Sequence, residues 1–262
     1  MNKIDERFGE IREKGDKALI AYFTAGIPSV KGTVEIIKKA EQSGVDIVEL
    51  GIPFSDPIAD GPIIQYASSL SLKKGTNTDT VFKICSKLKK SVKIPYLLMT
   101  YYNPVYRYGI ARFAKRCADT GVSGIIIPDL PFEESREVRE VLRKKDIYLI
   151  NFLTPFTPKI RAERIIKKSK GFIYFITSAG VTGPREKFSE KMWENLKVIK
   201  KITDIPIAAG FGISDSNQVK SMKKSVDGVI IGSFFVKKII DGKMKKLWQA
   251  IKEVKEVLVR EN

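Results

Sequence analysis

The chain has 262 residues and a formal net charge of +17, from 47 Lys and Arg residues against 30 Asp and Glu residues, and it contains no histidine. The lack of histidine excludes Ser-His-Asp and Cys-His catalytic arrangements and disfavours a metal site, because most catalytic zinc sites use imidazole ligands. Acid and base chemistry must therefore fall to carboxylates, tyrosines or lysines.

The positive charge is spread along the chain. Lysines recur in short groups near the ends of predicted helices, which favours a solvated basic surface over a nucleic-acid partner. No apolar run approaches the roughly 18 to 20 residues that a membrane helix needs, and the opening segment MNKIDERFGE has no apolar signal-peptide core. We therefore expect a soluble, cytoplasmic protein without a membrane partner.

A helix is predicted near residues 2–14, and eight short apolar runs follow, each succeeded by an amphipathic segment. The runs span residues 18–24, 46–50, 95–100, 124–128, 147–152, 171–176, 205–209 and 227–231. Apolar strands joined by helical crossovers imply a parallel sheet covered on both faces. Eight such units favour a closed (β/α)₈ TIM barrel over an open doubly wound sheet.

The second run is followed by an extra helix near residues 62–73. No linker, low-complexity segment or charge block divides the chain, so we expect one barrel domain over residues 1–262. In such a barrel the active site lies at the C-terminal ends of the strands. The polar residues at those ends are therefore the candidates for catalysis.

Glu49 ends the second run, and alternation places it on the same face as Ile47, opposite Val48 and Leu50. If that face is the barrel interior, desolvation raises the pKa of the carboxyl group and suits it to proton transfer. The alternative is a strand-end glutamate paired with a helix or a lysine.

Two further segments carry acids. The loop GIPFSDPIADGP holds Asp56 and Asp60 between prolines and glycines, which is typical of a lid over the barrel mouth or of a structural turn. Asp129 closes the fourth run, in IIIPDLP, and either belongs to the site or accepts loop hydrogen bonds.

Glycine-rich loops follow the last three strand runs: SAGVTGP at 178–184, AGFGIS at 209–214 and IGSFFVKK at 231–238. Gly232 and Ser233 open the helix after the eighth run. Backbone N–H groups at a helix N-terminus beside glycines form an anion site, and barrels commonly build a phosphate site after strands seven and eight. The alternative is a set of ordinary strand-to-helix turns.

None of the eight runs contains a lysine. A Schiff-base aldolase normally needs a desolvated lysine on a barrel strand, so that class is disfavoured. A divalent-metal aldolase or epimerase usually recruits histidines, and the chain has none.

Several motifs together resemble one family. ELGIPFSDPIADGP at 49–62, followed by Gln65, and SAGVTG at 178–183 are similar to the two signature segments of the tryptophan synthase alpha subunits. PYLLMTYYNPV, IIIPDLP, AAGFGIS and GSFFV occur with similar spacing, so the resemblance runs from about Ala18 to Val236. Thr100-Tyr101-Tyr102 and Ser178 depart from the family pattern, and Tyr22 stands where phenylalanine is familiar.

The resemblance implies a lyase of tryptophan biosynthesis that cleaves indole-3-glycerol phosphate into indole and glyceraldehyde 3-phosphate by a retro-aldol reaction. Glu49 would protonate the indole ring carbon and then help to remove the proton of the adjacent glycerol hydroxyl. Asp60 would bind the indole N–H and stabilise the iminium that forms. Tyr174 matches a family tyrosine near the glutamate, and this chemistry needs no cofactor in the chain.

The resemblance also assigns binding residues. Phosphate would bind at Gly183, Gly212, Gly232 and Ser233. The indole pocket would be lined by Tyr22, Leu98 and Phe211, and Thr182 is a further candidate. The partner would be a PLP-dependent beta subunit in an alpha2-beta2 heterotetramer, contacted through Asp56, Asn103 and Pro104.

Two other classes remain open on the residues alone. One is another phosphate-binding barrel enzyme that uses Glu49 as its base, such as an isomerase or indole-3-glycerol phosphate synthase, although the absence of a strand lysine disfavours the synthase. The other is a non-catalytic binding protein or a nucleic-acid protein on the same fold, which the charge of +17 suggests.

Overall fold

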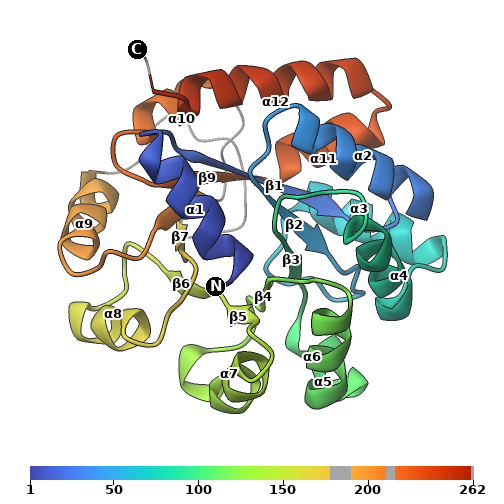
Figure 1. The fold of residues 1–262 in the computed structure, drawn as a ribbon, viewed down its shortest axis with the longest axis horizontal. Coiled ribbons are helices and arrows are strands. Elements are labelled where there is room, and N and C mark those ends of the chain that lie inside the picture. The colour runs from blue at the N-terminus through green and yellow to red at the C-terminus, as the bar shows by residue number, and fades with distance from the viewer. Residues whose placement is uncertain (178–189, 211–215, 261–262) are drawn as a thin grey trace.

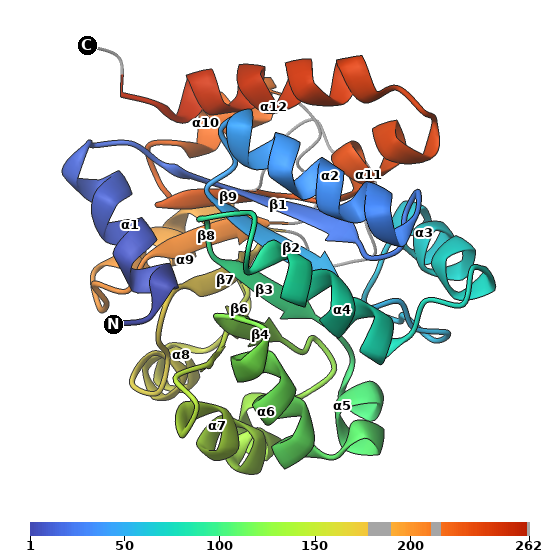
Figure 2. The same cartoon turned by 45° about the vertical axis from the view of Figure 1, so that its right-hand side comes forward.

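The structure, a computed structural model, describes residues 1–177, 190–210 and 216–260. Within these residues it has one parallel nine-stranded sheet, in the order β5-β4-β3-β2-β1-β9-β8-β7-β6. The strands are β1 (Ala18–Thr24), β2 (Ile47–Gly51), β3 (Tyr96–Met99), β4 (Gly124–Ile126), β5 (Tyr148–Leu149), β6 (Asn151–Leu153), β7 (Ile173–Ile176), β8 (Ile207–Gly210) and β9 (Gly228–Ile231). Figures 1 and 2 show these strands surrounded by helices.

The fifth predicted run is split into β5 and β6, with only Ile150 between them. β5 pairs with β4, and β6 pairs with β7, so this one stretch joins the two edges of the sheet. The Ile150 amide donates to the Ile125 carbonyl at 2.9 Å and so extends the β4 ladder. The eight predicted runs therefore correspond to the eight strand positions of a barrel, and the predicted (β/α)₈ fold is confirmed.

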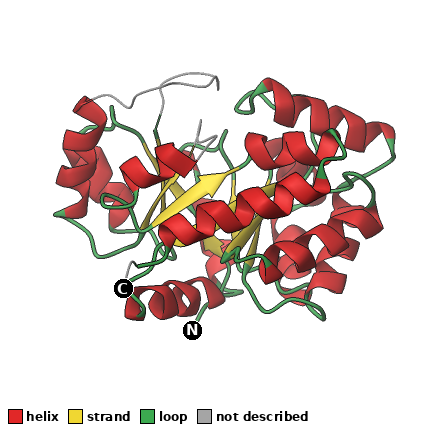
Figure 3. Ribbon diagram, turned by 90° about the horizontal axis from the view of Figure 1, so that it is seen from above, coloured by secondary structure: helices red, strands yellow, loops and turns green. Residues whose placement is uncertain are grey.

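Helices form the outer layer of the barrel, as Figure 3 shows in red around the yellow strands. They are α1 (Lys3–Glu13), α2 (Val30–Gln42), α3 (Pro62–Lys73), α4 (Thr78–Leu88), α5 (Tyr102–Tyr108), α6 (Ile110–Asp119), α7 (Arg136–Arg143), α8 (Lys159–Ile166), α9 (Glu190–Lys200), α10 (Ser216–Met222), α11 (Ser233–Ile240) and α12 (Met244–Leu258), with a 3₁₀ turn at Phe132–Glu134. The predicted N-terminal helix is α1, and the extra helix after the second strand is α3. Of the helices in the described ranges, none has both the length and the apolar character needed to cross a bilayer.

Side chains that cap the first turn explain where several helices begin. The side chains of Asn2, Ser29 and Asn77 accept hydrogen bonds from backbone amides in the first turns of α1, α2 and α4. Each such cap satisfies an amide that would otherwise lack a partner within the helix.

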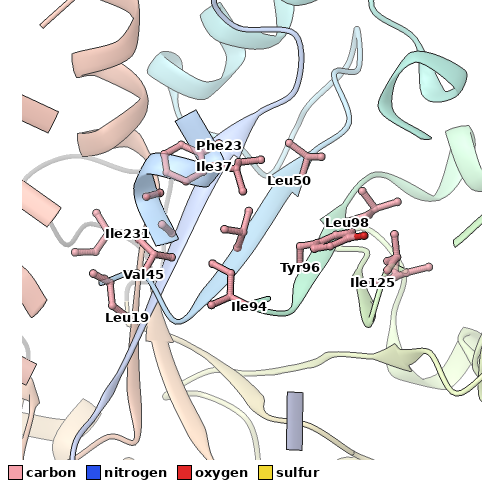
Figure 4. Close-up of a cluster of buried hydrophobic side chains, with 14 of the residues drawn as sticks. Leu19, Phe23, Ile37, Val45, Leu50, Ile94, Tyr96, Leu98, Ile125 and Ile231 are labelled. Atoms are coloured by element: carbon pink, nitrogen blue, oxygen red, sulfur yellow. The ribbon is translucent and has the colours of Figure 1, made fainter. Parts of the chain in front are cut away.

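Alternation along the strands divides the buried side chains into two clusters. One cluster, shown in part in Figure 4, lies between the sheet and the helices and includes Leu19, Phe23 and Leu50. The other fills the barrel interior and includes Ile20 and Ile47. Inward and outward faces therefore follow the period of two that the strand geometry imposes.

Helix α1 closes the N-terminal end of the barrel. Ile4 and Phe8 belong to the interior cluster, and the Phe8 ring lies 5.7 Å from the ring of Phe172. Ile4 also contacts the glycines that begin or precede β4 and β7, since a Cβ added at Gly124 or Gly171 would lie 3.1 or 3.2 Å from its side chain. The accessible end of the barrel is consequently the one where the strands end.

A buried aspartate ties α1, β1 and α12 together. Asp46, which is fully buried, accepts hydrogen bonds from Arg7 Nη2 at 2.6 Å, from Lys255 Nζ at 2.8 Å and from the Leu19 amide at 2.7 Å. Because three donors satisfy the carboxylate, its burial is compensated.

We expect Asp46→Ala to lower the free energy of unfolding by about 3 kcal/mol, because the substitution leaves two partly buried cations and one buried amide without their acceptor. Urea unfolding followed by circular dichroism measures the change. Asp119→Ala is the matched control, since it removes an exposed i,i+4 ion pair with Lys115, and it should change stability little. Equal effects of the two substitutions would contradict the role given to Asp46.

Candidate active site

Glu49 lies on β2 and points into the barrel. In register it stands between Tyr22 of β1 and Leu97 of β3, which both belong to the interior cluster. The Glu49 side chain is 1% exposed, and its Oε1 atom has no hydrogen-bond partner among the described residues. Burial alone raises the pKa of its carboxyl group from 4.5 to about 8. A glutamate paired with a lysine would not show this shift, so the catalytic interpretation is favoured.

Asp60 lies at the end of the loop between β2 and α3 and is also buried. Its Oδ2 atom accepts a hydrogen bond from the Tyr101 hydroxyl at 2.9 Å. Burial raises the pKa of this carboxyl group to about 6, and the hydrogen bond from Tyr101 limits the rise.

The loop that carries Asp60 is fixed at several points. The amide of Ala59 donates to the Tyr101 hydroxyl at 3.0 Å, and the Phe54 ring stacks on the Tyr101 ring at 5.3 Å. Gln65 of α3 donates through Nε2 to the Asp60 carbonyl at 2.9 Å. Tyr101 therefore holds both the backbone and the carboxylate of this loop, a role that sequence reasoning missed because 41 residues separate Tyr101 from Asp60.

Tyr22 and Tyr174 both lie inside the barrel near the two carboxyl groups. Burial raises the pKa of each tyrosine hydroxyl well above its ordinary value, and the charges of both Glu49 and Asp60 add to the rise in each case. A charge raises the pKa of a hydroxyl group in this way only when it lies nearby. Both carboxyl groups therefore lie close to the hydroxyl groups of both tyrosines. The sequence-predicted Glu49, Asp60, Tyr22 and Tyr174 are thus brought together at one end of the barrel.

Glycine leaves the space that these tyrosines fill. A Cβ added at Gly210 would lie 2.6 Å from the hydroxyl oxygen of Tyr174, and a Cβ at Gly51 would collide with the Tyr22 hydroxyl. Phe152 packs on the other side of Tyr174, with ring centroids 5.0 Å apart. The positions of both hydroxyl groups therefore depend on glycines at the ends of β2 and β8.

The N-terminus of α11 lies beside the same interior. Gly232 is its N-cap, and a Cβ added there would lie 3.4 Å from Tyr22 Cβ and 3.5 Å from Ile64 Cδ1. Backbone N–H groups in the first turn of this helix, at Ser233 and beyond, form the kind of terminus that attracts an anion. The other predicted residues of this region, Gly183, Gly212, Phe211 and Thr182, lie outside the described residues.

The prediction that Leu98 lines the indole pocket is wrong. Parallel pairing aligns Leu98 with Leu50 on the outward face, and Leu98 packs in the cluster between sheet and helices, close to Ile125 (Figure 4). Its neighbour Met99 is the residue of this strand end that belongs to the interior cluster. A sequence gives the alternation within a strand, but it does not say which parity faces inward until the strand is paired.

The remaining predicted residues lie at the surface. Asp129 is exposed, and its Oδ1 atom accepts a hydrogen bond from the Tyr102 amide at 2.8 Å. Of the two interpretations of Asp129 given above, this contact supports the one in which it accepts a loop hydrogen bond. Asp56 and Asn103 are exposed and Pro104 is half-buried. Within the described ranges, no group of three or more Cys, Asp or Glu residues could hold a metal ion.

The raised pKa of Glu49 links stability to pH. The folded protein holds this proton more tightly than the unfolded chain, so its contribution to stability is complete below pH 4.5 and is lost as the pH rises through about 8. We expect Glu49→Gln, which does not titrate, to gain about 4 kcal/mol relative to the parent across this interval. Urea unfolding at several pH values tests this, with exposed Glu35→Gln as control. Parallel curves for the parent and Glu49→Gln would show that Glu49 is not desolvated.

Comparisons with known proteins agree on one family. The family model described as "Tryptophan synthase alpha chain" matches residues 8–261. The chain is 41% identical to the tryptophan synthase alpha chain of Caldanaerobacter subterraneus subsp. tengcongensis over 99% of this chain and 98% of that protein. It is 42% identical to that of Arabidopsis thaliana, over 96% of this chain and 91% of the relative.

Solved structures give the same result. A chain of Mycobacterium tuberculosis tryptophan synthase superposes with a TM-score of 0.92 at 30% identity, over 99% of both chains. Tryptophan synthase subunit alpha from Legionella pneumophila superposes with a TM-score of 0.89 at 30% identity, over 98% of both chains. Sequence and fold therefore agree along nearly the whole length, and the chain belongs to the tryptophan synthase alpha chain family.

Proposed function

We propose that this protein cleaves indole-3-glycerol phosphate into indole and glyceraldehyde 3-phosphate, with Glu49 and Asp60 as its catalytic carboxyl groups. The observation that carries the proposal is the burial of both carboxyl groups in one site, which raises their pKa values to about 8 for Glu49 and about 6 for Asp60. At pH 7 Glu49 is mostly protonated and Asp60 is mostly ionised. Two carboxyl groups in one site therefore supply an acid and an anion at the same time.

In the first step, Glu49 donates its proton to the indole ring carbon that carries the glycerol phosphate chain. The ring becomes an iminium cation, and its N–H group donates a hydrogen bond to the Asp60 carboxylate. A fixed anion is worth most where positive charge develops away from water. The burial of Asp60 and its hydrogen bond from Tyr101 supply that setting.

In the second step, the glycerol hydroxyl next to the scissile bond gives its proton to the Glu49 carboxylate. The carbon–carbon bond breaks, and its electron pair returns to the ring and neutralises the iminium. Indole and the aldehyde are released, and Glu49 is protonated again. The protonated indole is the electron sink, so the reaction needs neither a Schiff-base lysine nor a cofactor in this chain.

Binding of the substrate phosphate is assigned to the N-terminus of α11, at Gly232 and Ser233, together with Gly183 and Gly212. The position of Gly232 against Tyr22 supports this assignment, because it sets the helix terminus beside the aromatic interior. Tyr22 and Tyr174 would flank the indole ring, and Phe211 and Thr182 would complete the pocket.

The family works with a tryptophan synthase beta subunit, which carries pyridoxal phosphate. We assign the contact to the surface that contains Asp56, Asn103 and Pro104. The exposure of Asp56 and Asn103 beside the loop that carries Asp60 supports this choice. A partner that presses on this loop would act directly on the placement of the catalytic aspartate. The cytoplasmic location stays a prediction.

Glu49→Gln should lower kcat for indole formation at least about 100-fold with little change in KM, because an isosteric amide neither donates nor accepts the proton that the reaction moves. The rate of indole release from indole-3-glycerol phosphate measures this. Exposed Glu35→Gln is the matched control and should retain the parent rate. Retention of most of the rate by Glu49→Gln would remove the mechanism.

The pH profile tests the division of roles. We expect kcat/KM to rise with an apparent pKa near 6, as Asp60 ionises, and to fall with one near 8, as Glu49 loses its proton. Tyr101→Phe removes a hydrogen bond to the Asp60 carboxylate and should move the acidic limb to higher pH by about one unit. Exposed Tyr106→Phe is the control. If the apparent pKa of the acidic limb does not change in Tyr101→Phe, the hydrogen bond from Tyr101 does not lower the pKa of Asp60.

A further inference from the structure

A second recess lies on the outside of the barrel, between α7 and α8. It has a volume of about 640 Å³ and is lined by one face along the length of α7, by the start of β5 and by the segment after α8. α7 packs against α6, whereas the recess opens on its other side. Figures 1 and 2 show α7 and α8 as neighbouring helices outside the strands β5 and β6. The recess is distinct from the barrel interior that contains Glu49.

The charged residues of its lining are mostly cations. The charged side chains are one glutamate, Glu140, and six cations: Arg136, Arg139, Arg143, Lys167, Lys168 and Lys170. Glu140 is already paired with Arg136, at 3.0 Å. No carboxylate of the described residues lies within ion-pair distance of any of the other five cations. Five uncompensated cations around one recess repel one another, and an anion between them would relieve that repulsion.

The arginines are arranged to act together. Arg136, Arg139 and Arg143 follow one another at intervals of three and four residues, which places them on one face of α7. Arg139 is half-buried, and its position is fixed by a hydrogen bond to Ser135 Oγ at 2.8 Å and by the Phe132 ring at 5.0 Å. Arg139 therefore adds a fixed positive charge at the N-terminal end of the recess.

The opposite wall and the floor come from the segment after α8 and the start of β5. Lys167, Lys168 and Lys170 follow α8, and the Lys170 ammonium lies 5.7 Å from the centre of the Tyr148 ring. Ser169, which is buried among these lysines, is fixed by a hydrogen bond from Asn151 at 2.9 Å. The recess therefore has basic side chains on two walls and the start of β5 as its floor.

We propose that this recess binds a small anion that carries several phosphate groups. Arginine forks bind phosphate oxygens in pairs, and lysines add point charges on the opposite wall. The volume lies within the range of about 300 to 1,000 Å³ that is typical of small-ligand sites. A nucleic-acid duplex presents its phosphates on a wide convex surface and would reach the rim rather than the floor, so the shape favours a small ligand.

Isothermal titration calorimetry of the full chain with inorganic tripolyphosphate at low ionic strength measures the dissociation constant and tests the proposal. Arg139→Gln/Arg143→Gln/Lys168→Gln should weaken binding at least about tenfold, because it removes three of the five uncompensated charges. The matched control is Lys245→Gln/Lys246→Gln/Lys252→Gln on α12, which removes the same net charge from exposed positions and should change the affinity less than about threefold. Unchanged affinity in both variants would place tripolyphosphate at the barrel mouth and overturn the proposal.

A second measurement needs no substitution. Tripolyphosphate should protect Arg136, Arg139 and Arg143 from phenylglyoxal, with the modified positions identified by mass spectrometry, and should leave exposed Arg107 reactive. Equal loss of affinity in the two triple variants, or equal protection of Arg107, would reduce the effect to net charge and overturn the proposal. Displacement of tripolyphosphate by a lower concentration of random duplex would overturn it in favour of a nucleic-acid surface.

Discussion

The site depends on one unsatisfied carboxyl group. Glu49 is enclosed by the barrel, and Oε1 has no hydrogen-bond partner among the described residues. A charged carboxylate in that setting would be expensive, so the group keeps its proton near neutral pH. Only a rigid enclosure can hold a polar group in this state, since any mobile neighbour or entering water would solvate it. The closed ring of strands, sealed at one end by α1, provides that enclosure.

The two catalytic carboxyl groups owe their different states to different kinds of structure. Glu49 is part of a strand, and the register of β1, β2 and β3 fixes its direction. Asp60 is carried on a loop and receives a hydrogen bond that favours its ionised form. On the strand, Glu49 Oε1 finds no hydrogen-bond donor among the described residues, whereas on the loop Asp60 meets the Tyr101 hydroxyl. The pair of environments separates the two pKa values in a chain that has no histidine.

The net charge of +17 is spread along the chain. Much of it lies on the outer faces and ends of helices, as the spacing of the lysines indicated. Between α7 and α8, however, cations of α7 and of the segment after α8 meet around one recess, and this concentration was not visible in the sequence because Arg139 and Lys168 belong to separate units of the barrel. A charge that is dispersed along the chain can still be concentrated in space.

Local patterns in the sequence were enough to predict the eight strand–helix units, the two additional helices, the shared face of Glu49 and Ile47 on the second strand, and the residues that form the signature segments. These features are local, because periodicity and capping act within a few residues of the chain. The tertiary structure alone decided that the fifth strand is divided at Ile150, that Met99 rather than Leu98 faces the interior, and that Tyr101 holds Asp60. Each of these depends on how strands far apart in the chain are paired, and pairing register is set by the closure of the whole barrel rather than by any one segment.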